Sequence, residues 1–426
     1  MAVVLQQVIA LLRTLLVTAA ALGTAWMALR MVPVRARGPE WMLDLLLLAA
    51  LSWVWLRSWK VWRDDALPAL ALALSGIGLM LIARLSPELG RRQEIWLFIS
   101  LGTATAAGPL FARVRRMAAY KYVWILGSLS LFLAVALFGQ EVNGARLWIR
   151  LGPLAFEPIE MIKLFIVFFM AAYLAETGDV IAAARPWSIR ANAKYLGPLV
   201  LGWGSSLAIL IFERDLGPAV LIFAIFATML YVATRRIDLI IAAGAALVGA
   251  MVWAAHRYPY VATRIAVWRN PDADPLGRGF QTLQGAYAVS AGGWFGTGYT
   301  LGHPGFIPDV ATDYIHAAWS EEFGFLGAVV LIAAYALLVS RALAVAKAQT
   351  DAYPKLLATG LGAMLGFQVL IIVGGVLGLL PLTGITLPFI SYGGSSLVSN
   401  FLAVGLLWSI SSRPIGGGSV SGRSSI

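Results

Sequence analysis

Residues 355–378 read KLLATGLGAMLGFQVLIIVGGVLG. After Lys355 this stretch contains no charged residue, and apolar and small side chains fill almost all of it. A helix needs about 20 mostly apolar residues to cross the hydrocarbon core of a bilayer. The stretch therefore predicts a membrane-spanning helix.

The same pattern recurs along the whole chain. Of the 426 residues, 60% are hydrophobic and 12% are charged, whereas charged residues make up about a quarter of soluble globular domains. The predicted fold class is therefore all-α: a polytopic membrane helix bundle of about 12 transmembrane helices, with a large extracellular loop. The predicted spans are 8–31, 41–57, 66–84, 93–112, 120–138, 159–175, 195–213, 216–234, 237–255, 321–343, 355–378 and 388–411.

Charge and cysteine content limit the kinds of binding partner and the kinds of catalytic or metal site. The net charge of +11 is scattered over short loops, which suits membrane lipids with anionic headgroups and argues against nucleic acid. The chain has no cysteine, which excludes disulfides, thiolate metal sites and a cysteine nucleophile. No P-loop, dinucleotide or zinc spacing is present. His256, His303 and His316 are far apart in the sequence and are predicted to be ordinary loop residues.

Loop charges predict the orientation. With the N-terminus inside, the inner loops carry fifteen Lys and Arg residues and the short outer loops carry nine, and cytoplasmic loops are the richer ones. Both termini are therefore predicted to be cytoplasmic, with 139–158 and 256–316 outside. The 256–316 segment lacks helix or strand periodicity and is predicted to be a long functional loop.

Four segments are more polar or more glycine-rich than a plain bundle requires. In the first, Glu160 and Lys163 lie three residues apart on one helical face, where they either fix a helix end or face a substrate cavity. The second, 213–215, is a charged turn for which a structural role is favoured. In the third, Asp313 precedes an apolar helix and is either its N-cap, the favoured interpretation, or a general base. The fourth, 380–396, is uncharged and rich in Gly and Ser, which suits either close helix packing or hydrogen bonds to phosphate and sugar oxygens.

Together these segments resemble the shape, elongation, division and sporulation (SEDS) family of bacteria, the RodA, FtsW and SpoVE proteins. The stretch PLTGITLPFISYGGSS at 381–396 is similar to that family's signature almost letter for letter. The resemblance covers roughly residues 70–412 and implies a ten-helix core at 66–412. Residues 1–65 would then hold two additional transmembrane helices, and the Gly- and Ser-rich 413–426 would be a flexible cytoplasmic tail.

The resemblance implies a peptidoglycan glycosyltransferase. Such an enzyme polymerises lipid II at the outer face of the bacterial cytoplasmic membrane for cell elongation, division or sporulation, with a class B penicillin-binding protein as its transpeptidase partner. Asp313 would be the catalytic carboxylate, removing a proton from the acceptor hydroxyl in an inverting displacement. A divalent cation, Mg²⁺ or Mn²⁺, is an open option beside the cationic side chains at the leaving diphosphate. The implied substrate-binding residues are Glu160, Lys163, Arg146, Arg150, Thr312, Ser391, Ser395 and Ser396.

Two positions depart from the family's pattern. Ala311 stands where the family usually has histidine, and Glu157 adds a carboxylate before Pro158. Two other functions use the same features: a flippase for lipid-linked precursors, which needs a polar path across the whole membrane, and a silent scaffold for a penicillin-binding protein. Ionisable residues cluster toward one predicted face, which favours the enzyme.

Overall fold

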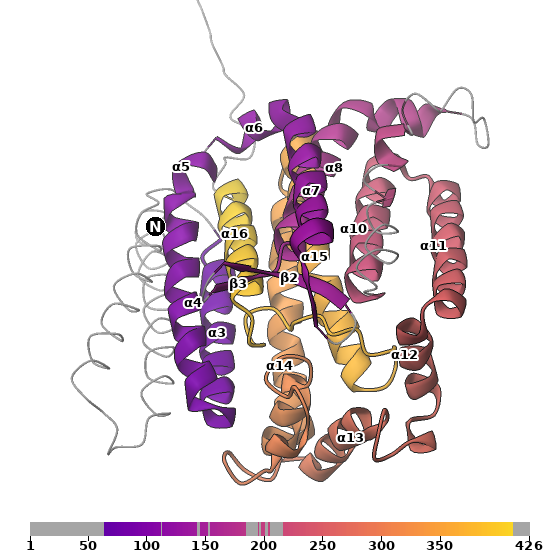
Figure 1. The fold of residues 1–426 in the computed structure, drawn as a ribbon. Coiled ribbons are helices and arrows are strands. Elements are labelled where there is room, and N and C mark those ends of the chain that lie inside the picture. Colours follow the sequence, from indigo (N-terminus) through magenta and orange to yellow (C-terminus); the bar gives the residue numbers. More distant parts are fainter. Residues whose placement is uncertain are drawn as a thin grey trace, which may run out of the picture.

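A computed structural model describes residues 64–111, 113–142, 145–151, 154–184, 195, 197–200, 203–204 and 216–411. Figure 1 shows a bundle of long helices, with α14 and α15 near its centre and α11 at one edge. Among the described residues, eight helices are long and apolar enough to cross a membrane. The predicted all-α, polytopic membrane class is confirmed.

The first half of the chain forms one side of the bundle and a small sheet. Its elements are α3 (Ala66–Leu85), α4 (Pro87–Ala106), α5 (Gly108–Phe111), α6 (Val114–Met117), η2 (Ala118–Tyr120), α7 (Lys121–Phe138), β1 (Gln140–Val142), β2 (Ala145–Leu151), β3 (Leu154–Phe156) and α8 (Ile159–Ala183). The second half holds α10 (Leu216–Thr234), α11 (Ile237–Arg257), α12 (Pro259–Arg269), η4 (Pro271–Ala273), α13 (Phe280–Gly292), η5 (Pro304–Phe306), α14 (Ile315–Lys347), α15 (Ala352–Val376) and α16 (Gly394–Ser411).

Nine of the predicted spans fall on helices within the described residues, namely α3, α4, α7, α8, α10, α11, α14, α15 and α16. The predicted spans 8–31 and 41–57, most of 195–213 and the charged turn at 213–215 lie outside those residues. The same holds for almost all of 1–65 and for the tail at 413–426.

Helix ends differ from the prediction where capping decides them. The helix α4 begins at Pro87 and not at residue 93, because the Ser86 hydroxyl accepts a hydrogen bond from the Leu89 N–H at 3.4 Å and proline suits a first turn. The helix α14 begins at Ile315 and bends at Gly324, whose φ is +67°. His316 is buried in its first turn and His256 lies in α11, so the prediction of ordinary loop residues is wrong for these two histidines.

The prediction that 256–316 is one long loop without helix periodicity is also wrong. It contains α12 and α13. Both helices are too short to be found by a search for membrane spans, and Pro259 starts α12 in the way proline starts helices generally. The helix α13 packs against α14, so this connection is largely an ordered part of the fold.

A small antiparallel sheet, which the sequence did not predict, follows α7. Its order is β1-β2-β3, with Gln140 opposite Trp148 and Ile149 opposite Phe156. Aromatic and β-branched residues such as these favour strands. The sheet lies across the bundle in Figure 1 and leads the chain into α8.

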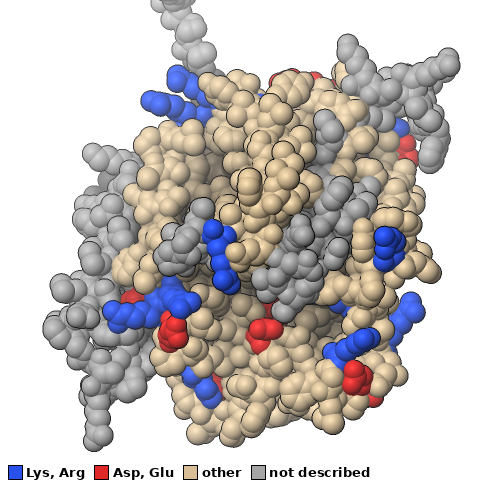
Figure 2. Space-filling view, viewed as in Figure 1, with Lys and Arg blue, Asp and Glu red and all other residues tan. Residues whose placement is uncertain are grey.

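The two ends of the bundle are distinct. At the start of α3, the Arg341 Nε donates to the Asp64 carboxylate at 2.7 Å. At the other end of the same helix, the Arg84 Nη2 donates to the Gly302 carbonyl at 2.8 Å. The 256–316 connection therefore lies at the end of the bundle opposite to Asp64. Figure 2 shows charged side chains near the top of this view and from mid-height downward, with mostly uncharged surface between these two regions.

Segment 381–396, called here the signature segment, is held against α3 by direct backbone contact. A Cβ atom at Gly78 would lie 2.6 Å from the Ile390 Cα, a separation that a side chain does not tolerate. Only glycine lets the segment come so close to the helix. This contact fixes one side of the segment that borders the candidate site.

Candidate active site

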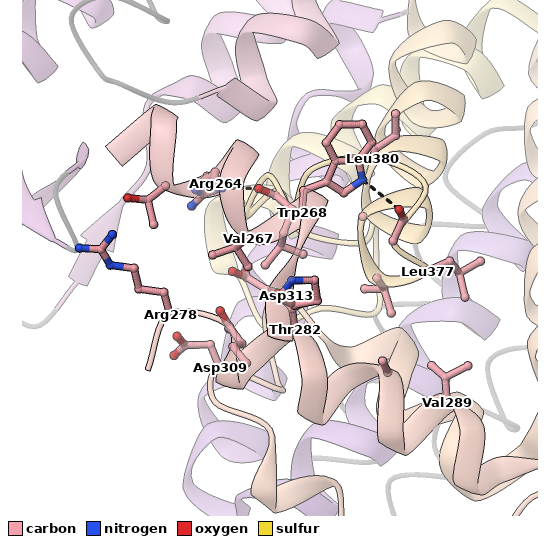
Figure 3. Close-up of a pocket in the computed structure, with 18 of the residues that line it drawn as sticks. Arg264, Val267, Trp268, Arg278, Thr282, Val289, Asp309, Asp313, Leu377 and Leu380 are labelled. Atoms are coloured by element: carbon pink, nitrogen blue, oxygen red, sulfur yellow. Dashed lines mark hydrogen bonds between the residues drawn. The ribbon is translucent and has the colours of Figure 1, made fainter. Parts of the chain in front are cut away.

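A cavity of about 540 Å³ lies where α12, α13, the turn before α14 and the end of α15 meet. Asp313, the carboxylate singled out from the sequence, lines it. Figure 3 shows the arrangement of its walls. The lining residues are Tyr260, Thr263, Arg264, Val267, Trp268, Pro271, Arg278, Gln281, Thr282, Ala286, Val289, Ser290, Asp309, Asp313, Gly375, Val376, Leu377, Gly378, Leu380 and Leu382.

One face of α12 forms a wall of the cavity. Tyr260, Arg264 and Trp268 recur every four residues, and a helix places such positions on one face. The Trp268 Nε1 donates to the Gly378 carbonyl at 2.9 Å, which ties α12 to the end of α15. The Arg264 Nη1 donates to the Leu382 carbonyl at 2.7 Å, and its guanidinium lies over the Tyr260 ring at 4.6 Å. Arg264 is thereby fixed between α12 and the chain that follows α15.

Asp313 is positioned by a tight turn. The Asp309 carbonyl accepts hydrogen bonds from the Thr312 N–H at 3.1 Å and the Asp313 N–H at 3.0 Å. From the other side, the Ser391 hydroxyl donates to the Thr312 carbonyl at 2.6 Å. The signature segment therefore supports the turn that carries the carboxylate.

Asp313 is not the N-cap of α14. That position belongs to Tyr314, which makes no side-chain capping bond. The Tyr314 hydroxyl donates to the Thr282 hydroxyl at 3.3 Å, and burial raises the pKa of Tyr314 above its usual value. The structure therefore gives the favoured helix-cap interpretation of Asp313 no support and leaves its carboxylate at the cavity.

Arg264 and Asp313 converge above Gly384 of the signature segment. A Cβ atom at Gly384 would lie 3.5 Å from the Arg264 Nη2 and 3.6 Å from the Asp313 Oδ2. Gly384 has a φ of +69°, a conformation in which residues with side chains are strained. The glycine thus leaves space beside a cation and a carboxylate, where a reacting group can be held.

The cavity has a charged side and an apolar side. In Figure 3, Arg278 and Asp309 lie on one side, Leu377 and Leu380 lie on the other, and Asp313 lies between them. Leu377 and Leu380 are themselves exposed. A ligand that joins a polar head to an apolar chain fits such a division.

Glu160 and Lys163 form a closed ion pair away from the cavity lining. The Lys163 Nζ lies 2.8 Å from the Glu160 Oε2, and both side chains are no more than 3% exposed. The Ser399 hydroxyl donates to the Glu160 Oε2 at 2.8 Å, and the Lys163 Nζ donates to the Gln368 Oε1 at 3.2 Å. Gln368 in turn donates to the Thr386 carbonyl at 2.9 Å. The pair therefore reaches the signature segment through Gln368.

The predicted serines also serve internal contacts. Ser391, Ser395 and Ser396 are buried. The Ser395 hydroxyl accepts a hydrogen bond from the Glu157 N–H at 3.0 Å. Arg150 is exposed on β2, whereas the side chain of Arg146 lies outside the described residues. Of the predicted site residues, Asp313 alone is among the lining residues of the cavity.

Sequence reasoning missed Arg264, Arg278 and Asp309. All three lie within the segment that was predicted to have no periodicity. The spacing of Tyr260, Arg264 and Trp268 is the signal that would have revealed α12, and Arg264 is the cation on the face that these three residues share. No signal in one sequence places Arg278 and Asp309 beside Asp313.

The described residues contain no group of three or more His, Asp or Glu side chains that could hold a metal ion. Asp309 and Asp313 are the two carboxylates that line the cavity. Mg²⁺ is commonly held by one or two carboxylates together with substrate phosphates and water. A divalent cation at this cavity therefore stays a prediction from the sequence.

Comparison with known proteins gives the same family for most of the chain. Residues 68–414 match the model of the cell cycle protein family of FtsW, RodA and SpoVE. Peptidoglycan glycosyltransferase RodA of Mycobacterium tuberculosis is 34% identical over 373 residues, which cover 84% of this chain and 79% of the relative. Stage V sporulation protein E of Bacillus subtilis is 37% identical over 275 residues, which cover 64% of this chain and 73% of the relative.

Solved structures share this fold. A chain of a peptidoglycan synthase complex that coordinates polymerization and crosslinking has a TM-score of 0.66 and 30% identity, over 83% of this chain and 98% of that one. The rod shape-determining protein RodA of Thermus thermophilus has a TM-score of 0.58 and 28% identity, over 83% of this chain and 97% of that one.

Proposed function

The chain belongs to the cell cycle protein family of FtsW, RodA and SpoVE, and we propose that it is a peptidoglycan glycosyltransferase that works in the cavity around Asp313. The observation that carries the proposal is the convergence of the Arg264 guanidinium and the Asp313 carboxylate above Gly384. The protein is a multi-pass membrane protein. Its substrate is lipid II, a disaccharide joined through a diphosphate to a polyprenyl chain.

Asp313 acts as the general base. Its carboxylate takes the proton from the acceptor sugar hydroxyl as that oxygen attacks the anomeric carbon of the donor. The new glycosidic bond forms while the bond from the anomeric carbon to the diphosphate oxygen breaks, and the diphosphate leaves with the bonding electron pair. Because this is a single direct displacement, the configuration at the anomeric carbon inverts.

Arg264 stabilises negative charge in this reaction. Its guanidinium is anchored by the Leu382 carbonyl and by the hydroxyl and ring of Tyr260. A donor that is already fixed gives its full effect in the transition state, because it need not reorganise when charge develops. The leaving diphosphate is the group that gains charge, so the substrate lies with its diphosphate near Arg264.

Glu160 and Lys163 act through the signature segment. Their contacts run from the ion pair to Gln368 and on to Thr386, and the described contacts of Glu160 and Lys163 are all internal. These contacts support the interpretation that the pair fixes local structure. They do not support direct contact of the two groups with substrate. The two side chains are therefore positioning residues.

The apolar side of the cavity accepts the lipid part of the substrate. Leu377 and Leu380 border the cavity, and both follow the apolar helix α15. A lipid-linked substrate can then enter sideways from the bilayer, with its head on the charged side. The bias of the loop charges supports the proposal that this end of the bundle lies at the outer face of the cytoplasmic membrane and that both termini are cytoplasmic.

A class B penicillin-binding protein is the proposed partner. A similar chain is part of a peptidoglycan synthase complex in which polymerization and crosslinking are coordinated. A polymerase of this family supplies uncrosslinked glycan strands, which a transpeptidase then joins.

The test is glycan synthesis from labelled lipid II by the purified full-length protein, resolved on gels, with and without a class B penicillin-binding protein. Wild type should make polymer, and Asp313→Ala should make none. Asp272→Ala is the matched control, since Asp272 is an exposed acid in the same connection and is not among the cavity lining residues. Wild-type protein that makes no polymer even with its partner, but moves lipid II between leaflets, would favour the flippase.

A further inference from the structure

Arg278 is an arginine that the fold leaves available at the cavity. Its backbone N–H donates to the Asp274 Oδ2 at 3.0 Å, which fixes the position of the chain just before α13. Its side chain is exposed, and within the described part of the chain its guanidinium makes no ion pair and no hydrogen bond. Arg264, by contrast, already gives one N–H donor to Leu382 and another to Tyr260. Arg278 can therefore bind a ligand without breaking a contact.

The position of Arg278 indicates which part of a substrate it meets. Figure 3 places it on the side of the cavity opposite to Leu377 and Leu380, with Asp313 between the two sides. On the proposed function, the polyprenyl chain takes the apolar side. The diphosphate is joined directly to that chain and lies near Arg264, which Figure 3 shows nearer to Leu377 and Leu380 than Arg278 is. Arg278 then faces the parts of the substrate that are farthest from the lipid.

In lipid II, the part farthest from the lipid that carries charge is the short peptide attached to the disaccharide, with its free carboxylates. A guanidinium matches a carboxylate through two parallel hydrogen bonds. We infer that Arg278 binds a carboxylate of this peptide and selects substrates in which that carboxylate is unmodified. The inference rests on the proposed function and makes Arg278 a specificity residue, distinct from the base Asp313.

Asp309 adds to the selectivity of this side. Its carboxylate lines the cavity near Arg278 in Figure 3, yet no ion pair joins the two side chains. The backbone of Asp309, with a φ of +51°, is occupied in building the turn before Asp313. A second negative charge on this side disfavours a carboxylate that is not matched to Arg278.

The experiment measures kcat and KM of glycan synthesis for two forms of lipid II, one with free peptide carboxylates and one with those carboxylates amidated. Arg278→Gln should raise KM for the free form roughly three- to tenfold, the range expected for an exposed charge pair with two hydrogen bonds, and leave kcat and the amidated form unchanged. Arg278→Lys should raise KM less, because lysine keeps the charge and loses the second hydrogen bond. Arg269→Gln is the control, since Arg269 is an exposed arginine at the end of α12 outside the cavity lining.

Each alternative outcome is distinct. An equal rise in KM for both forms would assign Arg278 to the diphosphate and overturn the inference, and so would no rise for either form. If Arg278→Gln does not fold, Arg278→Lys carries the same comparison. Failure of the proposed function looks different, because wild-type protein would then make no polymer from either form of the substrate.

Discussion

The Arg264 guanidinium and the Asp313 carboxylate reach toward one point above Gly384. An atom added to Gly384 would lie 3.5 Å from Arg264 Nη2 and 3.6 Å from Asp313 Oδ2. Arg264 comes from α12 and Asp313 from the turn before α14, so neighbouring parts of the fold must be in place before the two meet. Because the pair is assembled by tertiary structure, substitutions in α12 and in the signature segment can each test its geometry.

Filling the space at Gly384 should reduce activity. Gly384→Ala places a methyl group between Arg264 and Asp313 and strains a backbone with a φ of +69°. The strain costs roughly 1–2 kcal/mol, and the methyl group takes space that the substrate needs beside the base, which should misplace the substrate and lower kcat on the order of 10². Gly293→Ala controls for the strain, since Gly293 also has a positive φ, of +52°, and no atom within 4 Å of the added methyl group. Equal kcat in both variants would contradict the account.

Removing the Arg264 guanidinium should slow the chemical step. Arg264→Gln keeps a shorter hydrogen-bond donor and loses the charge, and kcat should fall on the order of 10², as when one fixed transition-state donor is removed. Arg264→Lys should recover part of the rate. Glycan synthesis from lipid II at saturating substrate measures both. A fall in stability without a fall in kcat would show that Arg264 only joins α12 to Leu382.

Breaking one half of the Glu160–Lys163 pair should destabilise the protein. The two groups are 2.8 Å apart and almost fully buried, and removing one partner of such a pair costs roughly 3–5 kcal/mol. The double variant Glu160→Leu with Lys163→Met should recover much of that loss, because no charge is left unpaired. Thermal melts in detergent measure stability. If the double variant is no more stable than the single variants, the two charges do not act as a closed pair.

Weakening the support of the Asp313 turn should have a smaller effect. The Ser391 hydroxyl donates to the Thr312 carbonyl at 2.6 Å and accepts from the Leu387 N–H at 2.9 Å. Ser391→Ala should cost about 1–3 kcal/mol of stability, the range for a buried polar group left without its partner, and lower kcat a few-fold. Ser340→Ala removes an exposed hydroxyl that bonds within its own helix and is the control. Unchanged stability in Ser391→Ala would argue against the supporting contact.

The length of the apolar stretches predicted the helix bundle well, because membrane helices must satisfy every backbone hydrogen bond internally. Span-length apolar runs such as 355–378 therefore fall on helices. The length of apolar stretches could not reveal α12 or α13, which are short and lie in a polar connection. It also could not find the three-stranded sheet, whose strands take their order from pairing with one another.

The sequence predicted only those parts of the candidate site that the type and position of a single residue indicate. Asp313 stood out as a carboxylate before an apolar helix, and it does line the cavity. Glu160 and Lys163 stood out as charges at membrane depth, but a sequence does not show whether such charges face a cavity or each other. Arg264 and Arg278 are brought to Asp313 by the packing of α12 and α13 beside the turn. The spacing of residues along the sequence does not predict that packing.

The most direct test of the account is the rate of glycan synthesis by Asp313→Asn compared with wild type, at matched thermal stability. Asparagine keeps the size of the side chain and loses its capacity to take a proton. The account predicts that kcat falls on the order of 10²–10⁴, that KM changes little, and that Asp272→Asn, with its exposed side chain in the same connection, retains the wild-type rate. If Asp313→Asn polymerises lipid II at the wild-type rate, Asp313 is not the base and the proposed mechanism is wrong.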